Sequence, residues 1–369
     1  MTYHLSTQAF RLLRLQAQRL LPASPGSESD AAWKLREVAG VQAQDLPAAQ
    51  LAVHVRAPGV SLAEIERARQ ESGDAIHTWA MRGTLHLLSR EDARWMIPLM
   101  APVFIASSRY RMEQLGWDEE NTSRGLHLLE KALSDRKAIT RAEIISLLKE
   151  NALPWQGQAP VHLLYRAAWE GFLIQGPDRG KKPAYLPAES WMGSFVHLPA
   201  LEAAVELGRR YLHAFAPATL KDLAAWSGLP IVLLRQAWQE LSDEIFPVVT
   251  GEQQAWMLKS DQSRLEGIAG TAPAVVLLAR FDNLLLGYAS REWTVEPQFA
   301  TRFKSGGGII SPTWLVDGKV RGIWRPLLKP HRLEVTFEPF EELNARVRIE
   351  LEAQASRLGT FFGKETTFK

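Results

Sequence analysis

Two glutamines in the chain, Gln42 and Gln44, flank a single small residue, Ala43. On a helix two such side chains would point about 200° apart, whereas in an extended segment they point to the same side and both amides reach one spot. A glutamine amide cannot deprotonate water, but its carbonyl can orient a water molecule and offer partial negative charge to a developing cation. The pair is therefore a candidate for assisted hydrolysis, with solvated loop glutamines as the alternative.

The residues around this pair predict an extended backbone between two helices. Gly40 suits the left-handed position that follows a helix. Asp45 and Pro47 are typical of the start of the next helix, which we expect to run to about Arg56. Asp45 is also the nearest carboxylate and so a candidate base, but the helix that starts directly after it favours the role of an N-cap.

The order helix, helix, hairpin occurs three times along the chain, which predicts three tandem winged-helix units. We expect helices near residues 10–21, 30–40, 45–56, 61–71, 160–169 and 230–241, and two more that begin at Thr140 and Thr219. We expect hairpin strands at 76–81 and 84–88, at 172–174 and 184–186, and at 246–249 and 255–258. The helix-turn-helix relatives of such units place the second helix in a DNA groove.

From about residue 272 the chain changes to short strands and ends in a charged helix at 341–358. Strands are expected at 274–278, 308–311, 313–316, 320–324 and 333–337, and the pair Asp317-Gly318 is typical of a two-residue hairpin turn. The predicted fold class is α+β and mainly helical, with three winged-helix units and a small C-terminal mixed α/β unit. The expected division is 1–130, 131–197, 198–262 and 263–369.

Composition excludes several classes of protein and site. The 369 residues are 46% hydrophobic, as in an ordinary folded chain, and 43 Lys and Arg against 41 Asp and Glu leave a net charge of +2. Cysteine is absent, which removes disulfides, thiolate metal sites and cysteine nucleophiles. The longest apolar run, 97–106, contains two prolines and is too short to span a membrane. Arginines interrupt the N-terminal segment, so we expect a cytoplasmic protein without a signal peptide.

Other catalytic patterns fail. The triglycine 306–308 lacks the following Lys-Ser/Thr of a phosphate-binding loop, and the sequence has no His-Glu-x-x-His. His77 and His86 would face each other if 76–81 and 84–88 form a hairpin, but we favour a structural role over a metal site. We expect neither a metal nor another cofactor.

The segment Gly40-Val41-Gln42-Ala43-Gln44 resembles the Gln-apolar-Gln motif of the winged-helix DNA glycosylases, the AlkZ-like family. Further resemblance, in the family's order, lies in residues 51–56, 82–86, 280–282, 315–318 and 322–324. It implies three winged helices in a C-shape around a DNA channel, with Gln42 and Gln44 as catalytic residues. A sister group, YcaQ-like, has aspartate where this chain has Gln44.

The same resemblance implies a monofunctional glycosylase that excises N-alkylated purines and in some members unhooks interstrand crosslinks, in DNA repair or in self-resistance to an alkylating agent. Because amides assist only weakly, we expect cationic lesions, whose leaving group is already activated. The expected partner is double-stranded DNA with alkylated bases, bound by a monomer. The alternative is a non-catalytic winged-helix transcriptional regulator, which would usually be a dimer that reads two half-sites.

Candidate phosphate contacts fall into two groups. The first group has five residues that we expect in exposed loops, where they contact phosphates or are simply solvated: Arg179, Lys181, Lys182, Arg302 and Lys304. Three more lie in the resembling stretches, where they bind flanking phosphates or else support the fold through buried pairing: Arg56, Arg82 and His86.

Overall fold

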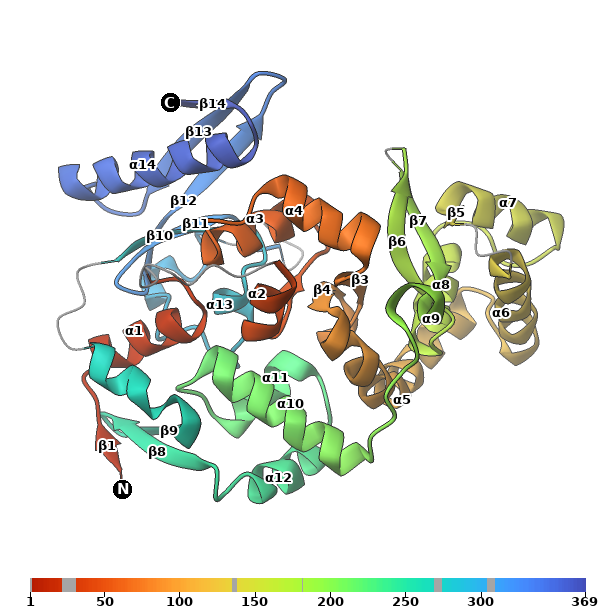
Figure 1. Ribbon diagram of the computed structural model, residues 1–369, viewed down its shortest axis with the longest axis horizontal. Coiled ribbons are helices and arrows are strands. Elements are labelled where there is room, and N and C mark those ends of the chain that lie inside the picture. Colours follow the sequence, from red (N-terminus) through yellow and green to blue (C-terminus); the bar gives the residue numbers. More distant parts are fainter. Residues whose placement is uncertain (1, 22–30, 135–137, 181, 269–273, 304–308) are drawn as a thin grey trace.

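The computed structural model describes residues 2–21, 31–134, 138–180, 182–268, 274–303 and 309–369 (Figure 1). The fold is mixed α/β. The helices are α1 (Thr7–Ala17), α2 (Ala31–Glu37), α3 (Leu46–Arg56), α4 (Leu62–Arg67), α5 (Arg90–Gln114), α6 (Glu119–Leu133), α7 (Arg141–Glu150), α8 (Ala159–Trp169), α9 (Ala188–Met192), α10 (Ala200–Phe215), α11 (Leu220–Ser227), α12 (Ile231–Glu240), α13 (Asn283–Leu286) and α14 (Ala345–Phe361).

The strands form three sheets in the described part of the chain. They are β1 (Tyr3–His4), β2 (Val41–Gln42), β3 (Ala75–Trp79), β4 (Leu85–Ser89), β5 (Ile139–Thr140), β6 (Leu173–Arg179), β7 (Lys182–Pro187), β8 (Ile245–Thr250), β9 (Gln253–Leu258), β10 (Val275–Leu278), β11 (Thr313–Val316), β12 (Lys319–Leu328), β13 (Arg332–Pro339) and β14 (Glu365–Phe368).

The three predicted helix–helix–hairpin stretches are present, and their helices begin where capping chemistry predicts. Thr140 caps α7 and Thr219 caps α11, each through a capping box in which an acidic side chain three residues later accepts from the cap's backbone N–H. Ser61 caps α4 in the same way. The Asp317-Gly318 turn between β11 and β12 has positive φ at both residues, which fits a two-residue hairpin.

Two of the hairpins merge into one sheet. The strand order is β2-β4-β3-β6-β7-β5, and β3 of the first hairpin pairs with β6 of the second through His77 and Gln175. The short strand β1 pairs in parallel with β8 of the third hairpin. Strands β1, β5 and β14 and helices α5, α6, α9, α10 and α13 were not expected from the sequence. Residues 309–311 form no strand, contrary to the expectation for 308–311; residue 308 lies outside the described residues. The fourfold division of the chain stays a prediction.

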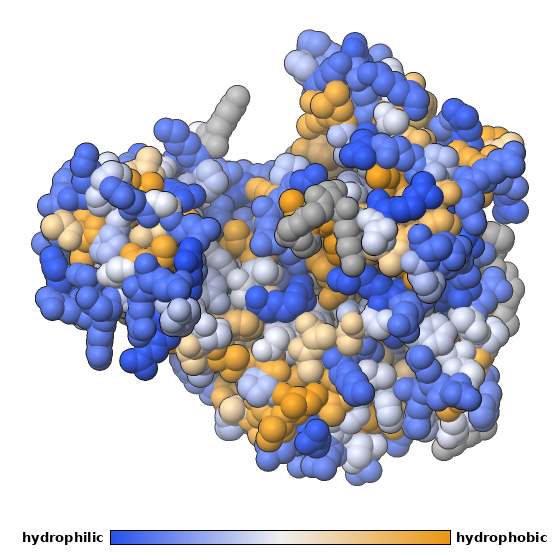
Figure 2. Space-filling view, turned by 180° about the vertical axis from the view of Figure 1, so that it is seen from behind, coloured by the Kyte–Doolittle hydropathy of each residue, from blue (hydrophilic) through white to orange (hydrophobic). Residues whose placement is uncertain are grey.

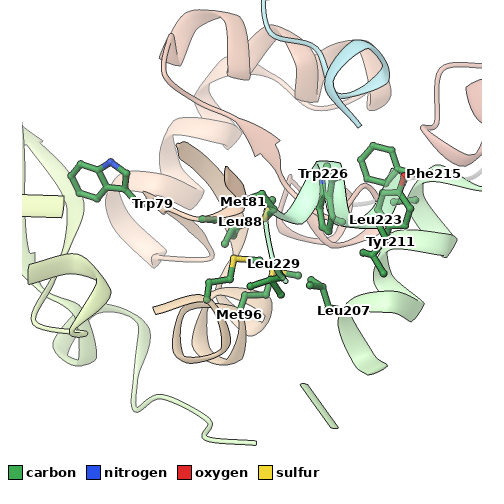
Figure 3. Close-up of a cluster of buried hydrophobic side chains, with 14 of the residues drawn as sticks. Trp79, Met81, Leu88, Met96, Leu207, Tyr211, Phe215, Leu223, Trp226 and Leu229 are labelled. Carbon is green, nitrogen blue, oxygen red and sulfur yellow. The ribbon is translucent and has the colours of Figure 1, made fainter. Parts of the chain in front are cut away.

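The first hairpin packs against the third helix–hairpin stretch in a shared core (Figure 3). Met81 and Leu88 of that hairpin lie beside Met96 of α5, and all three are buried. Leu223 and Trp226 of α11 close the cluster from the other side. The tip of the first hairpin is consequently packed against the end of α11, which brings residues about 140 positions apart in sequence into contact.

The surface is hollowed between two projecting parts of the molecule. Seen from behind, a concave outline separates the lobe that carries α6 and α7 from the C-terminal strands with α14 (Figure 2). Among the described helices none is both long and apolar enough to cross a membrane.

Candidate active site

Gln42 lies in the extended strand β2, as the sequence predicts, and Gln44 lies in the bend that follows this strand. Gly40, with φ +79°, ends the turn after α2, and β2 then pairs with β4 so that Gln42 lies opposite His86. The backbone N–H of Ala43 donates to the carbonyl of Leu85 at 2.7 Å. The amide side chains can therefore reach the same side of the segment.

A directional chain of hydrogen bonds links the two glutamines to an arginine. Arg82 Nη2 donates to Gln42 Oε1 at 2.7 Å, and Gln42 Nε2 donates to Gln44 Oε1 at 2.6 Å. A guanidinium has only donors, so the Gln42 atom that faces it must be the carbonyl oxygen and the amide nitrogen must face Gln44. Gln42 is 7% exposed whereas Gln44 is exposed, so the chain runs from a half-buried cation through a buried amide to an amide at the surface.

The tip of the first hairpin holds Arg82 in place. Arg82 has φ +56°, a left-handed conformation that is uncommon for a residue with a side chain. Its Nη1 donates to the carbonyl of Trp226, at the end of α11, at 2.7 Å. Burial, and to a smaller degree the nearby Arg291, lowers the pKa of Arg82 to about 10. Arg82 is therefore still a cation at neutral pH and polarises the Gln42 amide.

Two buried histidines support the backbone around the site. His77 Nε2 donates to the carbonyl of Ala43 at 3.0 Å, and His86 Nδ1 donates to that of Thr84 at 2.9 Å. Burial lowers the pKa of His77 to about 4 and that of His86, beside Arg82, to about 3, so both rings are neutral at pH 7.

The two histidines do not face each other, contrary to the expectation from the sequence. In the hairpin His86 lies opposite Thr78 and His77 lies opposite Leu87. Adjacent strand positions project to opposite faces, so the rings are directed apart. No group of three potential metal ligands occurs among the residues that the structure describes.

Asp45 is occupied as a helix cap. Its Oδ1 accepts from the backbone N–H of Ala48 at 3.2 Å, and its Oδ2 lies 3.5 Å from Arg280 Nη1. Both carboxylate oxygens therefore have partners, which agrees with the predicted N-cap and leaves Asp45 poorly suited to act as a base.

Comparison with known proteins gives the chain a family. The family model described as DNA glycosylase AlkZ-like matches residues 35–361. The chain belongs to this AlkZ-like family. An interstrand DNA cross-link repair glycosylase of Streptomyces sahachiroi is 31% identical over 333 residues, which cover 84% of this chain and 85% of that protein. The solved structure of the Streptomyces sahachiroi DNA glycosylase AlkZ matches with a TM-score of 0.80 at 26% identity, and the match covers 99% of this chain and 100% of that one.

Three of the candidate phosphate contacts instead form hydrogen bonds within the protein, which is the other role that the sequence leaves open for them. Arg56 is buried and forms a two-pronged ion pair with Asp282, with both nitrogen–oxygen distances at 2.8 Å. His86 is 2% exposed and neutral. The two terminal nitrogens of Arg82 donate hydrogen bonds to Gln42 and to the carbonyl of Trp226. These side chains bind other parts of the protein, because an unpaired charge in the interior would be costly.

The surface candidates are placed differently. Lys182, at the start of β7, is exposed. Arg179 is exposed but donates to the carboxylate of Glu143 at 2.7 Å, and Arg302 donates to the carbonyl of Phe340 at 2.9 Å with its guanidinium over the Phe340 ring. Lys181 and Lys304 lie outside the described residues. DNA contact by these residues stays a prediction.

Sequence reasoning missed the role of Arg82 toward Gln42. Arg82-Gly83 between two strand-like segments does indicate a turn, so the position of the hairpin tip was predictable. The carbonyl of Trp226, which accepts a hydrogen bond from Arg82, is 144 residues away in the chain, and no local sequence pattern predicts such a contact.

Proposed function

We propose that this protein is a monofunctional DNA glycosylase that hydrolyses the N-glycosidic bond of cationic N-alkylated purines. The observation that carries the proposal is the ordered chain from Arg82 through Gln42 to Gln44, which ends in an exposed amide. Membership of the AlkZ-like family supports the reaction class and leaves the transcriptional regulator without support.

In the proposed step, the bond between the sugar C1′ and the base nitrogen breaks and its electron pair neutralises the cationic purine. A water oxygen forms the new bond to C1′, and its proton passes to bulk water. Gln44 Oε1 accepts from Gln42 with one lone pair, so the other can accept from this water. The partial negative charge of that oxygen also stabilises the positive charge that develops on the sugar.

The proposed substrate class follows from the weak catalytic assistance that an amide can give. An amide supplies orientation and a dipole but no base, and Asp45 is occupied by Ala48 and Arg280. The lesion must therefore activate its own leaving group, as purines alkylated at N7 or N3 do through their positive charge. A crosslink between two such purines would be unhooked by the same step, since cleavage of one glycosidic bond frees one strand. The name of the Streptomyces sahachiroi relative supports that extension.

We further propose that the helix–helix–hairpin stretches are winged helices and that the duplex lies in the concavity between the lobe with α6 and α7 and the C-terminal strands (Figure 2). Lys182 on the second hairpin is an exposed cation placed to meet phosphates there. Phosphate contacts of this kind bind independently of sequence, as a repair enzyme requires.

Substitutions at Gln44 test the chemistry. Gln44→Ala should slow excision by about 10²-fold because one preorganised polar contact is lost. Gln44→Asp should stay active on cationic lesions, because a carboxylate still accepts from Gln42 Nε2 and stabilises positive charge. The measurement is single-turnover cleavage of an oligonucleotide with one N7-methylguanine, in which alkali converts abasic sites into strand breaks. Equal losses in the two variants, or efficient excision of uracil by the unmodified protein, would contradict the mechanism.

A further inference from the structure

The segment Arg280–Asn283, between β10 and α13, contacts both ends of the loop that carries the glutamines. Asn283 Nδ2 donates to the carbonyl of Gly40 at 2.5 Å, two residues before Gln42. Arg280 Nη1 lies 3.5 Å from Asp45 Oδ2, one residue after Gln44. The two contacts therefore bracket the pair from one short stretch of the C-terminal unit.

This segment is itself anchored in the interior. Asp282 and Arg56 are fully buried as side chains and share two hydrogen bonds, and Asp282 Oδ1 also accepts from the backbone N–H of Leu284 at 2.9 Å. Phe281 has φ +59°, and this turn lets its two neighbours diverge: Arg280 is half-exposed beside Asp45, and Asp282 is buried against α3.

The opposite side of the loop is closed as well. Gly40 lies so near β4 that a Cβ on it would come within 2.9 Å of the Leu87 carbonyl oxygen. Val41 and Gln42 are paired with that strand. The Gly40 end of the loop is thus held by β4 and by the Asn283 amide, so loss of the amide removes the hydrogen bond from the C-terminal unit.

We propose that Asn283 and Arg280 are positioning residues that hold Gln42 and Gln44 in line with Arg82, with the Asp282–Arg56 pair as their anchor. Asn283 binds the backbone carbonyl of Gly40 before the pair, and Arg280 binds the Asp45 carboxylate that caps α3 after it. The kinetic part of this inference rests on the proposed glycosylase function, whereas the structural part does not. A small displacement of a group that orients water slows a reaction much more than it weakens binding.

The test combines hydrogen exchange with kinetics in Asn283→Ala. Backbone amides of residues 40–45 should exchange about tenfold faster than in the unmodified protein, because local opening loses a hydrogen bond that opposes it. The single-turnover rate constant for N7-methylguanine excision should fall about 10- to 100-fold. The DNA concentration at half-maximal rate should stay within about threefold, because the substituted side chain is buried and binds no DNA.

Gln354→Ala is the matched control. Gln354 is also an amide of the C-terminal unit with both ends bonded to backbone, since its Nε2 donates to Val275 O and its Oε1 accepts from Leu277 N–H, but it does not touch the glutamine loop. It should change neither exchange at 40–45 nor the excision rate. Equal effects of the two substitutions would overturn the inference, because they would report general loosening of the C-terminal unit.

Arg280→Gln covers the case in which Asn283→Ala does not fold. Arg280 is 43% exposed, so its substitution leaves the interior intact. It should raise exchange at residues 43–48 and slow excision about threefold. Unchanged exchange in every variant that folds would overturn the inference. An unmodified protein that is inactive on N7-methylguanine would instead refute the proposed function, and exchange alone would then decide the positioning role.

Discussion

The two neighbouring hairpins of the six-stranded sheet both carry basic residues at or beside their tips, but one tip is enclosed by other parts of the protein and the other is open. The tip between β3 and β4 carries Arg82, and the tip between β6 and β7 is flanked by Arg179 and Lys182. At the first tip a Cβ on Gly83 would lie 2.6 Å from Tyr165 Oη, so the tip is enclosed. At the second, a Cβ on Gly180 would meet no atom within 4 Å.

The comparison shows that the covering element, not the hairpin, decides what a basic tip residue does. Helix α11 ends against the first tip: its Trp226 carbonyl accepts from Arg82, and a Cβ on the following Gly228 would lie 3.2 Å from Arg82 Cα. The cation there donates to two protein acceptors, Trp226 and Gln42. Nothing among the described residues lies within 4 Å of a Cβ on Gly180, and Lys182, two residues further on, is exposed to solvent.

The largest effect is expected at the enclosed tip. Arg82→Met removes the donor to Gln42 and leaves two carbonyls, those of Gln42 and Trp226, without it. The Gln42 amide can then rotate by about 180°, which would exchange its oxygen and nitrogen. The single-turnover rate constant for excision should fall by about 10²-fold, and DNA affinity should stay within a few fold of the unmodified protein. Lys182→Met is the matched control and should keep the excision rate. A rate that survives Arg82→Met in a folded protein would show that the hydrogen-bonded chain is dispensable.

A second prediction concerns acid stability, which should depend on the first hairpin. His77 and His86 have pKa values of about 4 and about 3 in the folded protein, well below the usual value of 6.5. As pH falls below about 6.5 the unfolded chain takes up these protons first, so stability is lost between that pH and the folded values. From pH 6.5 to 5.0 each histidine should cost up to about 2 kcal/mol of unfolding free energy.

Urea unfolding at the two pH values measures this loss. Between pH 6.5 and 5.0 the unfolding free energy of His86→Gln should fall by about 2 kcal/mol less than that of the unmodified protein. The variant has only one of the two buried histidines whose protonation favours the unfolded chain. The other histidines with shifted pKa values contribute alike to both proteins: His54 and His162, where it is lowered, and His213, where it is raised. His127→Gln, at an exposed site on α6, is the control and should follow the unmodified protein. Identical losses in all three proteins would disprove buried neutral histidines.

The smallest effect is expected at the open tip. Lys182→Met should weaken DNA binding a few fold at moderate salt and flatten the slope of log affinity against log salt by up to about 0.9, the value for one phosphate contact. Arg82→Met should leave that slope unchanged, since its charge is turned inward. Binding titrations on undamaged duplex at several salt concentrations give both slopes. An unchanged slope in Lys182→Met would remove the second hairpin from the DNA interface.

Local patterns were sufficient for most of the secondary structure. The capping boxes at Thr140 and Thr219, the Gly40 turn, the Asp45 cap and the Asp317-Gly318 hairpin turn each depend on residues within a few positions of one another. Such contacts form between residues that are close in the sequence, so the local sequence is enough to predict them. The extended backbone at Gln42 was predictable for the same reason.

By itself, then, the sequence determined the order of most of the elements, the family and the extended backbone at Gln42. Only the tertiary structure decided which charges serve the site. Arg56 is paired with Asp282, 226 residues away, and Arg82 with a carbonyl 144 residues away, so both donate to acceptors of the protein itself. The physical reason is desolvation: burial makes an unpaired cation costly, and the acceptor that compensates for it comes from whichever distant segment the fold brings near.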